Sequence, residues 1–293
     1  MTDTFVAEEL ASQPETWRRA AALAPEFADA LPQPGERVAV VGCGTSWFIA
    51  MTYAVLRERA GLGLTDAFAG SEYPVGREYD RVVAISRSGT TTEIVQLLAG
   101  LTTQKTVLLT AVGDSPAAAE ADQVIALPFA DERSVVQTRF ATTGLALLRA
   151  GLGDDIEMLA RQAEIALDLP IDDLLSAEQV TFIGTGPAVG LTFEAALKTR
   201  EAAQFWAESY PSMDYRHGPI AIAQPGRLVW SLDEAPEGLV DDVDATGATF
   251  VHHDLDPQAA LVVVHRFAVA LAVARGLDPD HPRSLTRSVI LAS

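Results

Sequence analysis

A hydroxyl-rich segment at residues 86–92 follows a short apolar run and precedes an apolar helical pattern. Five of its seven residues are Ser or Thr, whereas a helix cap needs only one. A strand that ends in such a loop and continues into a helix directs hydroxyl and free N–H groups at one point, where the helix dipole favours negative charge. The segment therefore predicts that the loop from Ser86 to Thr92 binds a phosphate group. The alternative is a solvated turn with one capping residue, and Arg87 either adds charge or points to solvent.

A second glycine turn, residues 42–46, follows the apolar run at residues 37–41. A dinucleotide fingerprint needs a third glycine three residues after the second, and Trp47 occupies that place. The turn at residues 184–186 also fails, because Gly190 comes one residue late. Thr45 and Ser46 favour contact with a ligand over a turn that only connects strand and helix.

Three charged residues of the second half, Glu194, Lys198 and Glu201, share one helix face because they are spaced i, i+4 and i+7. Two interpretations remain open at this point. A solvated ladder of salt bridges is the usual meaning of such a run. The flanking residues are apolar, however, and a carboxylate partly removed from water can act as a proton-transferring base.

His217 stands before a Gly-Pro break, which places it on a loop. It is either a general acid–base or a histidine without a chemical role. The five histidines show no metal-ligand spacing, so we expect neither a metal nor another cofactor.

Short apolar runs alternate with helical patterns, which predicts parallel sheets covered on both faces by helices, an α/β fold. In the first half we expect a helical region at 5–31, strands at 37–41, 64–69, 82–85, 105–110 and 123–127, and a helix at 47–60. In the second half we expect a largely helical stretch at 142–167, a helix at 191–207 and strands at 179–183, 228–230 and 260–264. The second half thus repeats the architecture of the first.

Composition narrows the class of ligand. The chain has 40 acidic and 21 basic residues and a net charge of −19, which opposes nucleic-acid binding. An anionic ligand must then be held by local donors. We find no apolar run long enough to span a membrane and no signal peptide, and the single Cys43 fits a reducing compartment. We therefore expect a cytoplasmic protein.

Taken together, these segments resemble the SIS (sugar isomerase) domain proteins, specifically the double-SIS isomerase half of glucosamine-6-phosphate synthase and its relatives. The order and spacing of the segments carry the resemblance, which covers nearly the whole chain. The matching residues are Glu9, Gln13 and Pro14, then 43–46, 85–89, 194–201, 216–219 and 282–289.

The resemblance implies two SIS subdomains, at residues 1–155 and 156–293. Each would be a parallel sheet flanked by helices, a three-layer αβα arrangement of the flavodoxin-like kind. It also implies a set of residues that bind the phosphorylated sugar or amino sugar. These are Thr45, Ser46, Ser86, Arg87, Ser88 and Thr91, with a backbone contact from Val135.

Catalytic roles follow from the same resemblance. Glu201 would move a proton between C1 and C2 of the open-chain sugar, with Glu194 and Lys198 in support. His217 would assist ring opening from the neighbouring subunit of a homodimer. Arg287 stands where the synthase has a lysine. It cannot form a Schiff base but can bind an oxyanion.

Three departures from the family pattern bear on the reaction: Arg87 with Thr90 in the first loop, Arg287 in the tail, and the expected lack of a glutaminase domain. They argue against glucosamine-6-phosphate synthesis. We expect an aldose/ketose isomerase, or a deaminase or deglycase of an amino-sugar phosphate. The alternatives are a sugar-phosphate sensor that acts through a protein partner and, third, a dehydrogenase.

Overall fold

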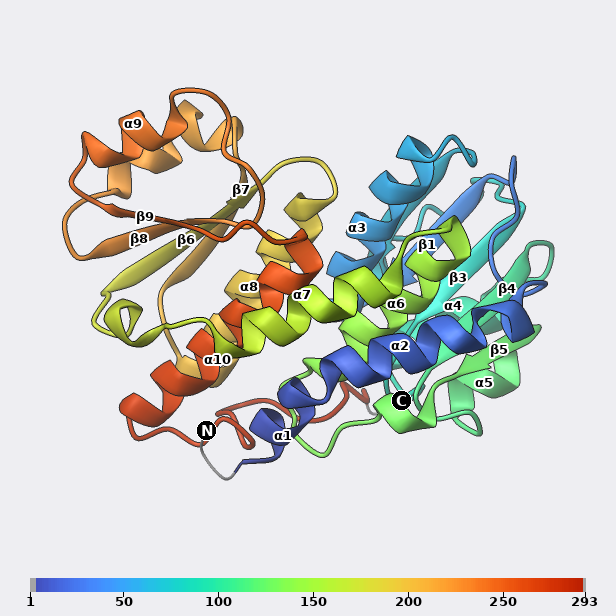
Figure 1. The fold of residues 1–293 in the computed structure, drawn as a ribbon. Coiled ribbons are helices and arrows are strands. Elements are labelled where there is room, and N and C mark those ends of the chain that lie inside the picture. The colour runs from blue at the N-terminus through green and yellow to red at the C-terminus, as the bar shows by residue number, and fades with distance from the viewer. Residues whose placement is uncertain (1–3, 292–293) are drawn as a thin grey trace. The chain divides into compact units, whose positions relative to one another are not determined.

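The computed structural model describes residues 4–291, which form two compact units, each with its own parallel sheet (Figure 1). We call them the five-stranded unit and the four-stranded unit. The five-stranded unit contains residues 15–133, 137–157 and 286–291. The four-stranded unit contains residues 4–14, 134–136 and 158–285. This confirms the predicted α/β class.

The sheet of the five-stranded unit has the order β2-β1-β3-β4-β5, and every pair is parallel. This is the flavodoxin-like order that the resemblance implied. β1 and β3 are buried throughout and, apart from Arg81, consist of apolar residues, as expected of strands covered on both faces. The strands are β1 (Val38–Gly42), β2 (Thr65–Ala69), β3 (Arg81–Ile85), β4 (Lys105–Thr110) and β5 (Gln123–Ala126).

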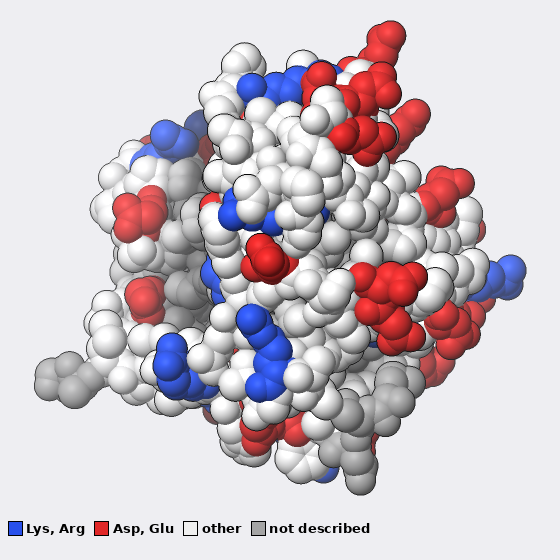
Figure 2. All heavy atoms as spheres, turned by 90° about the vertical axis from the view of Figure 1, so that its left-hand side faces the viewer, with Lys and Arg blue, Asp and Glu red and all other residues white. Residues whose placement is uncertain are grey.

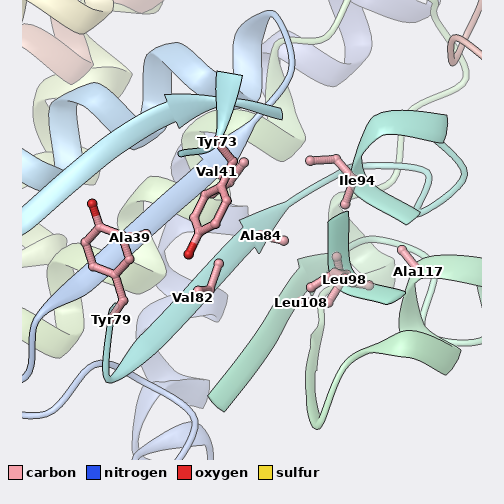
Figure 3. Packing of buried hydrophobic residues seen from close by; sticks show 10 residues of the cluster. All are labelled: Ala39, Val41, Tyr73, Tyr79, Val82, Ala84, Ile94, Leu98, Leu108 and Ala117. Atoms are coloured by element: carbon pink, nitrogen blue, oxygen red, sulfur yellow. The ribbon is translucent and has the colours of Figure 1, made fainter. Parts of the chain in front are cut away.

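Helices cover both faces of this sheet. On one face, Ala39, Val82 and Leu108 pack with Ile94 and Leu98 of α4 (Figure 3). On the other face, Gly144 of α6 lies so close to Leu109 that a Cβ there would be 3.2 Å from its side chain. The helices are α2 (Gln13–Leu23), α3 (Thr45–Arg59), α4 (Thr92–Gly100), α5 (Pro116–Glu120) and α6 (Arg139–Leu152), with 3-10 turns η1 (Ala24–Phe27), η2 (Gly70–Glu72) and η3 (Pro128–Ala130).

The sheet of the four-stranded unit has the order β7-β6-β8-β9 and is also parallel. α8 and α10 pack together, while α9, η5 and η6 supply residues to an apolar cluster with Ile183 and Val229. The strands are β6 (Gln179–Gly184), β7 (Ala207–Pro211), β8 (Arg227–Ser231) and β9 (Thr249–His252). The helices are α1 (Phe5–Ala11), α7 (Ile156–Asp168), α8 (Ala188–Ala203), α9 (Leu239–Asp244) and α10 (Pro257–Ala274), with η4 (Asp172–Leu174), η5 (Asp214–His217) and η6 (Pro219–Ile222).

Two expectations about the elements were wrong. Residues 260–264 are not a strand but part of α10, whose start is set by Pro257 and by the Asp256 side chain, which accepts from the Gln258 N–H. The helix expected at 191–207 ends at Ala203, and β7 follows it. The stretch 142–167 is largely helical, as expected, and consists of α6 and α7, because Gly153 takes a left-handed conformation and ends α6.

The two ends of the chain do not belong to the units that a division into residues 1–155 and 156–293 assigns them to. α1 belongs with the four-stranded unit, where the Asp280 carboxylate accepts the N–H groups of Phe5 and Val6, each at 2.8 Å. A carboxylate at a helix N-terminus satisfies free donors and complements the dipole. Residues 286–291 belong instead with the five-stranded unit.

Among the described residues, α10 is the helix that is long and apolar enough to cross a membrane. It is 72% buried inside the structure and packs on α8. Its apolar character is therefore that of a core helix.

We expect Leu108→Ala to lower the free energy of unfolding by about 2–5 kcal/mol, because Leu108 is fully buried among Ile94, Leu98 and Ala117 and its removal leaves a cavity. Urea denaturation measures this. The control is Leu64→Ala at a half-exposed position, where the loss should stay within about 0.5 kcal/mol. Equal losses at both positions would contradict the described core.

Candidate functional site

The turn after β1 is tight enough to require glycine. A Cβ on Gly42 would lie 2.4 Å from the carbonyl carbon of Ser46, and Gly44 has a positive φ of 53°. The turn brings the start of α3 back against the strand and buries Thr45 and Ser46. Both predicted phosphate ligands on this turn therefore lie at the N-terminus of a 15-residue helix.

The loop after β3 is held by its own hydroxyl groups. Ser86 Oγ accepts the Gly89 N–H at 3.2 Å, and Ser88 Oγ accepts the Thr90 N–H at 3.2 Å and the Thr90 hydroxyl at 2.8 Å. Gly89 has a φ of 62°, and a Cβ there would overlap Ser115 Oγ at 1.9 Å. Each serine hydroxyl keeps a hydrogen to donate to an anion.

These two loops lie beside each other. β1 and β3 are neighbouring parallel strands, and their last residues, Gly42 and Ile85, are paired in register. Because parallel strands present their carboxyl ends at one edge, residues 43–46 and 86–91 leave the sheet from adjacent positions. The structure therefore brings together the hydroxyl residues that the sequence placed 40 residues apart.

The C-terminal segment, residues 286–291, lies along the second loop. Arg87 Nη2 donates to the Arg287 carbonyl at 2.8 Å, the Thr90 and Ser288 hydroxyls are 2.8 Å apart, and the Thr92 N–H donates to the Val289 carbonyl at 3.2 Å. One α4 donor that the sequence left free for phosphate is thus bonded to the tail. Thr91 is the N-cap residue of α4, yet its side chain makes no capping bond.

Arg87 does not point to solvent. Its side chain is 1% exposed and forms an ion pair with the buried Glu132, with Nη1 and Oε2 4.0 Å apart. Glu132 also accepts the N–H groups of Thr138, Arg139 and Phe140 at the start of α6. The Arg287 side chain pairs with Asp131 and donates to the Glu132 carbonyl. Both arginines thus connect the tail and the loop to the segment that begins α6.

The charged face of α8 is not a solvated ladder. Glu194 and Lys198 are buried, and the Glu201 side chain is 19% exposed. Lys198 Nζ lies 3.7 Å from Glu194 Oε1 and contacts Glu201 Oε2. Buried charges persist where they are paired. The pairing fixes the Glu201 carboxylate at the edge of the buried row, where a ligand can reach it.

A buried histidine beside this row escaped the sequence analysis. His265 of α10 is 1% exposed, and its Nδ1 lies 3.4 Å from Nε2 of Gln13. Burial, and secondly the charge of Lys198, lower the pKa of His265 from 6.5 to about 3, so the ring is neutral. The available signal was the polar pair of His265 and Arg266 between the apolar runs 259–264 and 267–269.

Two further predicted residues lie elsewhere in the four-stranded unit. His217 is exposed at the end of η5, and its side chain has no hydrogen bond or ion pair to another described residue. The Val135 N–H donates to the Asp280 carbonyl at 3.3 Å. The structure therefore groups Glu194, Lys198 and Glu201 on α8 but does not pair His217 with them.

Each unit thus offers one chemical capability. The five-stranded unit gathers hydroxyl groups and the start of two helices, which suits an anionic group. The four-stranded unit presents a carboxylate fixed by a lysine, which suits proton transfer.

Comparisons with known proteins identify the domain family and the fold. Residues 33–150 match the SIS domain family. The glutamine–fructose-6-phosphate aminotransferase (isomerizing) of Sulfurisphaera tokodaii is 28% identical, over 87% of this chain and 50% of that protein. The chain spans about half the length of the curated relatives it matches.

Two solved structures share the fold. Glucosamine-6-phosphate deaminase from Thermotoga maritima aligns with a TM-score of 0.82 at 24% identity, over 98% of this chain and 100% of that chain. Tagatose-6-phosphate ketose/aldose isomerase from Escherichia coli aligns with a TM-score of 0.77 at 19% identity, over 99% of this chain and 97% of that chain. The resemblance inferred from the motifs is confirmed, together with the fold that it implied.

We expect His265 to make the protein less stable as pH falls from 6.5 towards 3. In that window the unfolded chain binds a proton at this residue and the folded chain does not, so acidification favours unfolding. His265→Gln should remove this contribution, on the order of a few kcal/mol at full extent. Urea denaturation at stepped pH compares the two proteins, and parallel stability curves would contradict the buried neutral ring.

Proposed function

The chain carries an SIS domain and is homologous to half of the glutamine–fructose-6-phosphate aminotransferases, and on this premise we propose that it is an enzyme that transfers a proton on a phosphorylated sugar. The reaction would be an aldose/ketose isomerisation, or the deamination or deglycation of an amino-sugar phosphate. Its partners would be a phosphorylated sugar or amino sugar and a second copy of the chain.

The observation that carries this proposal is the buried charged row on α8. A protein that only binds a sugar phosphate has no need of a carboxylate held at the edge of the core by a buried lysine. Glu194 and Lys198 are removed from water while Glu201 keeps part of its surface exposed. This arrangement supports Glu201 as a base positioned by Lys198.

In the proposed mechanism, the hydroxyls of Thr45, Ser46, Ser86, Ser88 and Thr91 bind the phosphate. Glu201 takes a proton from C1 or C2 of the open-chain sugar and returns it to the neighbouring carbon, through an enediol or enediolamine. Lys198 holds the carboxylate and contacts substrate hydroxyls together with Glu194. Arg87 and Arg287 hold the loop and the tail in place through Glu132 and Asp131.

We also propose that the chain acts as a homodimer in the cytoplasm, with His217 supplied to the site of the neighbouring subunit. Its exposure and its position before Gly218, which has a φ of 146°, support a role on a projecting turn. There it would assist opening of the sugar ring.

We expect Glu201→Gln to lower kcat by about 10²–10⁴-fold while sugar-phosphate binding is retained, because the amide cannot accept the proton. NMR in deuterated water with fructose 6-phosphate and glucosamine 6-phosphate follows deuterium entry at C1 or C2. The matched control is Glu178→Gln, an exposed carboxylate of the same unit, which should exchange like the wild type.

Two outcomes would contradict this mechanism. Undiminished exchange in Glu201→Gln would remove Glu201 from proton transfer. Binding without any deuterium entry in the wild type would favour the sensor over the enzyme.

We expect Thr91→Val to weaken sugar-phosphate binding about 10-fold, the effect of losing one hydrogen bond to a charged group. Thr91 suits this test because its hydroxyl makes no capping bond, so α4 should stay intact. Thermal shift with fructose 6-phosphate measures the change, and Thr103→Val, exposed in the same unit, is the control. Unchanged binding would show that the phosphate does not use this loop.

A further inference from the structure

Gln13 and His265 form a polar contact inside the core of the four-stranded unit. Gln13 is the first residue of α2, His265 lies in the middle of α10, and both belong to this unit. Gln13 is 0% exposed and His265 is 1% exposed, and Nε2 of the first is 3.4 Å from Nδ1 of the second. We call these two residues the Gln13–His265 pair. Polar side chains that are buried so completely need a physical reason.

The contact fixes the state of the imidazole ring. The side-chain amide nitrogen of Gln13 can only donate, so Nδ1 of His265 accepts and the ring proton is on Nε2. Burial, and secondly the charge of Lys198, lower the pKa of His265 to about 3, so the ring is neutral at neutral pH. Gln13 therefore holds a neutral imidazole in one tautomer and one orientation.

Stability alone does not explain this ring. Its Nε2, which carries the proton, is buried and has no hydrogen-bond partner among the described residues. A buried donor that is left unpaired costs free energy, and an apolar side chain of similar size would avoid that cost. Polar groups retained at the expense of stability are expected at functional sites. The surroundings of the ring therefore indicate its role.

These surroundings include the buried charges of α8. The chain has a net charge of −19, and Figure 2 shows acidic side chains in clusters at the surface of one face. Glu194 and Lys198 differ from these, because both are buried. α10 packs on α8 and lies beside it in Figure 1, and the charge of Lys198 acts on the ring of His265. His265 therefore lies within electrostatic range of the Lys198 ammonium group.

A neutral ring at this place keeps the ammonium group with its partners on α8. α10 contains no Asp or Glu, and its other ionisable side chain, Arg266, donates to two backbone carbonyl groups. An imidazolium on α10 would repel the ammonium, and a carboxylate there would attract it away from α8. Because the ring is neither, Lys198 stays paired with Glu194 and Glu201.

We propose that Gln13 and His265 are positioning residues for the proton transfer assigned to Glu201. Gln13 holds the ring, the ring limits where the Lys198 side chain can lie, and Lys198 holds the Glu201 carboxylate. The inference rests on the proposed function and goes beyond it, because it adds two residues that do not contact the sugar. Since both are fully buried, their loss should slow the transfer without weakening binding of the sugar phosphate.

The test uses the similar shapes of glutamine and methionine. Gln13→Met removes the donor, His265→Met removes the acceptor, and His265→Gln restores an amide oxygen that can accept from Gln13. The ligand is whichever of fructose 6-phosphate and glucosamine 6-phosphate the wild type exchanges. Calorimetric titration gives its Kd, and NMR in deuterated water gives the rate of deuterium entry at C1 or C2 at saturating ligand.

We expect Gln13→Met and His265→Met to slow exchange by about 10- to 100-fold, the effect of a small displacement of a reacting group, with Kd changed less than about 2-fold. His265→Gln should recover most of the rate. The double variant Gln13→Met with His265→Met should lose no more than either single variant, because the two residues act as one unit.

Gln179→Met is the matched control. Gln179 is another buried glutamine of the four-stranded unit, and its amide donates to the Thr181 hydroxyl at 2.8 Å, so the variant loses a comparable buried hydrogen bond. Its melting temperature should fall by an amount similar to that of Gln13→Met, while its exchange rate stays that of the wild type. If His265→Met does not fold, Gln13→Met and this control decide the question.

Wild-type exchange rates in the Met variants of the Gln13–His265 pair would overturn the inference and leave the proposed function intact. Equal slowing in Gln179→Met would also overturn it, as would a weaker Kd at an unchanged rate, which would assign the pair to binding. A rate in His265→Gln as low as in His265→Met would contradict the role of the acceptor. If the wild type exchanges neither sugar phosphate, the proposed function fails, and the positioning role fails with it.

Discussion

One buried ammonium group organises the chemistry of the four-stranded unit. Lys198 lies in the core, where a lone charge is costly, and it is stable there because Glu194 and Glu201 accompany it on the same helix face. Its position depends on α10, which packs on α8 and carries His265, and on Gln13, whose amide meets that ring. The partial exposure of the Glu201 carboxylate therefore depends on the packing of α8, α10 and Gln13, and not on the Glu201 side chain alone.

The five-stranded unit obeys a simpler constraint. Its parallel strands end at one edge, so whatever follows β1 and β3 must meet there. The Ser86 and Ser88 hydroxyls stabilise the loop through hydrogen bonds within it. The Arg87 side chain stabilises it further, because it donates to the Arg287 carbonyl of the tail and pairs with Glu132. A ligand therefore finds donors that need little rearrangement, which lowers the entropic cost of binding.

Local patterns predicted the sheets and the loops, because strand, glycine turn and helix are adjacent in the chain. The same reasoning failed at residues 260–264, where a short apolar run is equally compatible with a buried helix. Contacts between residues far apart in the chain could not be predicted from local sequence patterns. Gln13 and His265 are 252 residues apart, and Arg87 meets the Arg287 carbonyl across 200. The spacing of Glu194, Lys198 and Glu201 predicted that they share one helix face. That Glu194 and Lys198 on this face are buried follows from tertiary packing, which the spacing does not reveal.

The bond between Asp280 and the first turn of α1 has a practical consequence for dissecting the molecule. The four-stranded unit includes the N-terminal helix α1, and the five-stranded unit includes the C-terminal tail. A cut at residue 155 would therefore separate α1 from the Asp280 carboxylate that caps it. It would also separate the tail from the loop after β3, to which the tail is hydrogen-bonded. Each separately expressed half would lack the terminal segment that packs on it. Isolating either sheet intact calls for a redesigned connectivity rather than a single truncation.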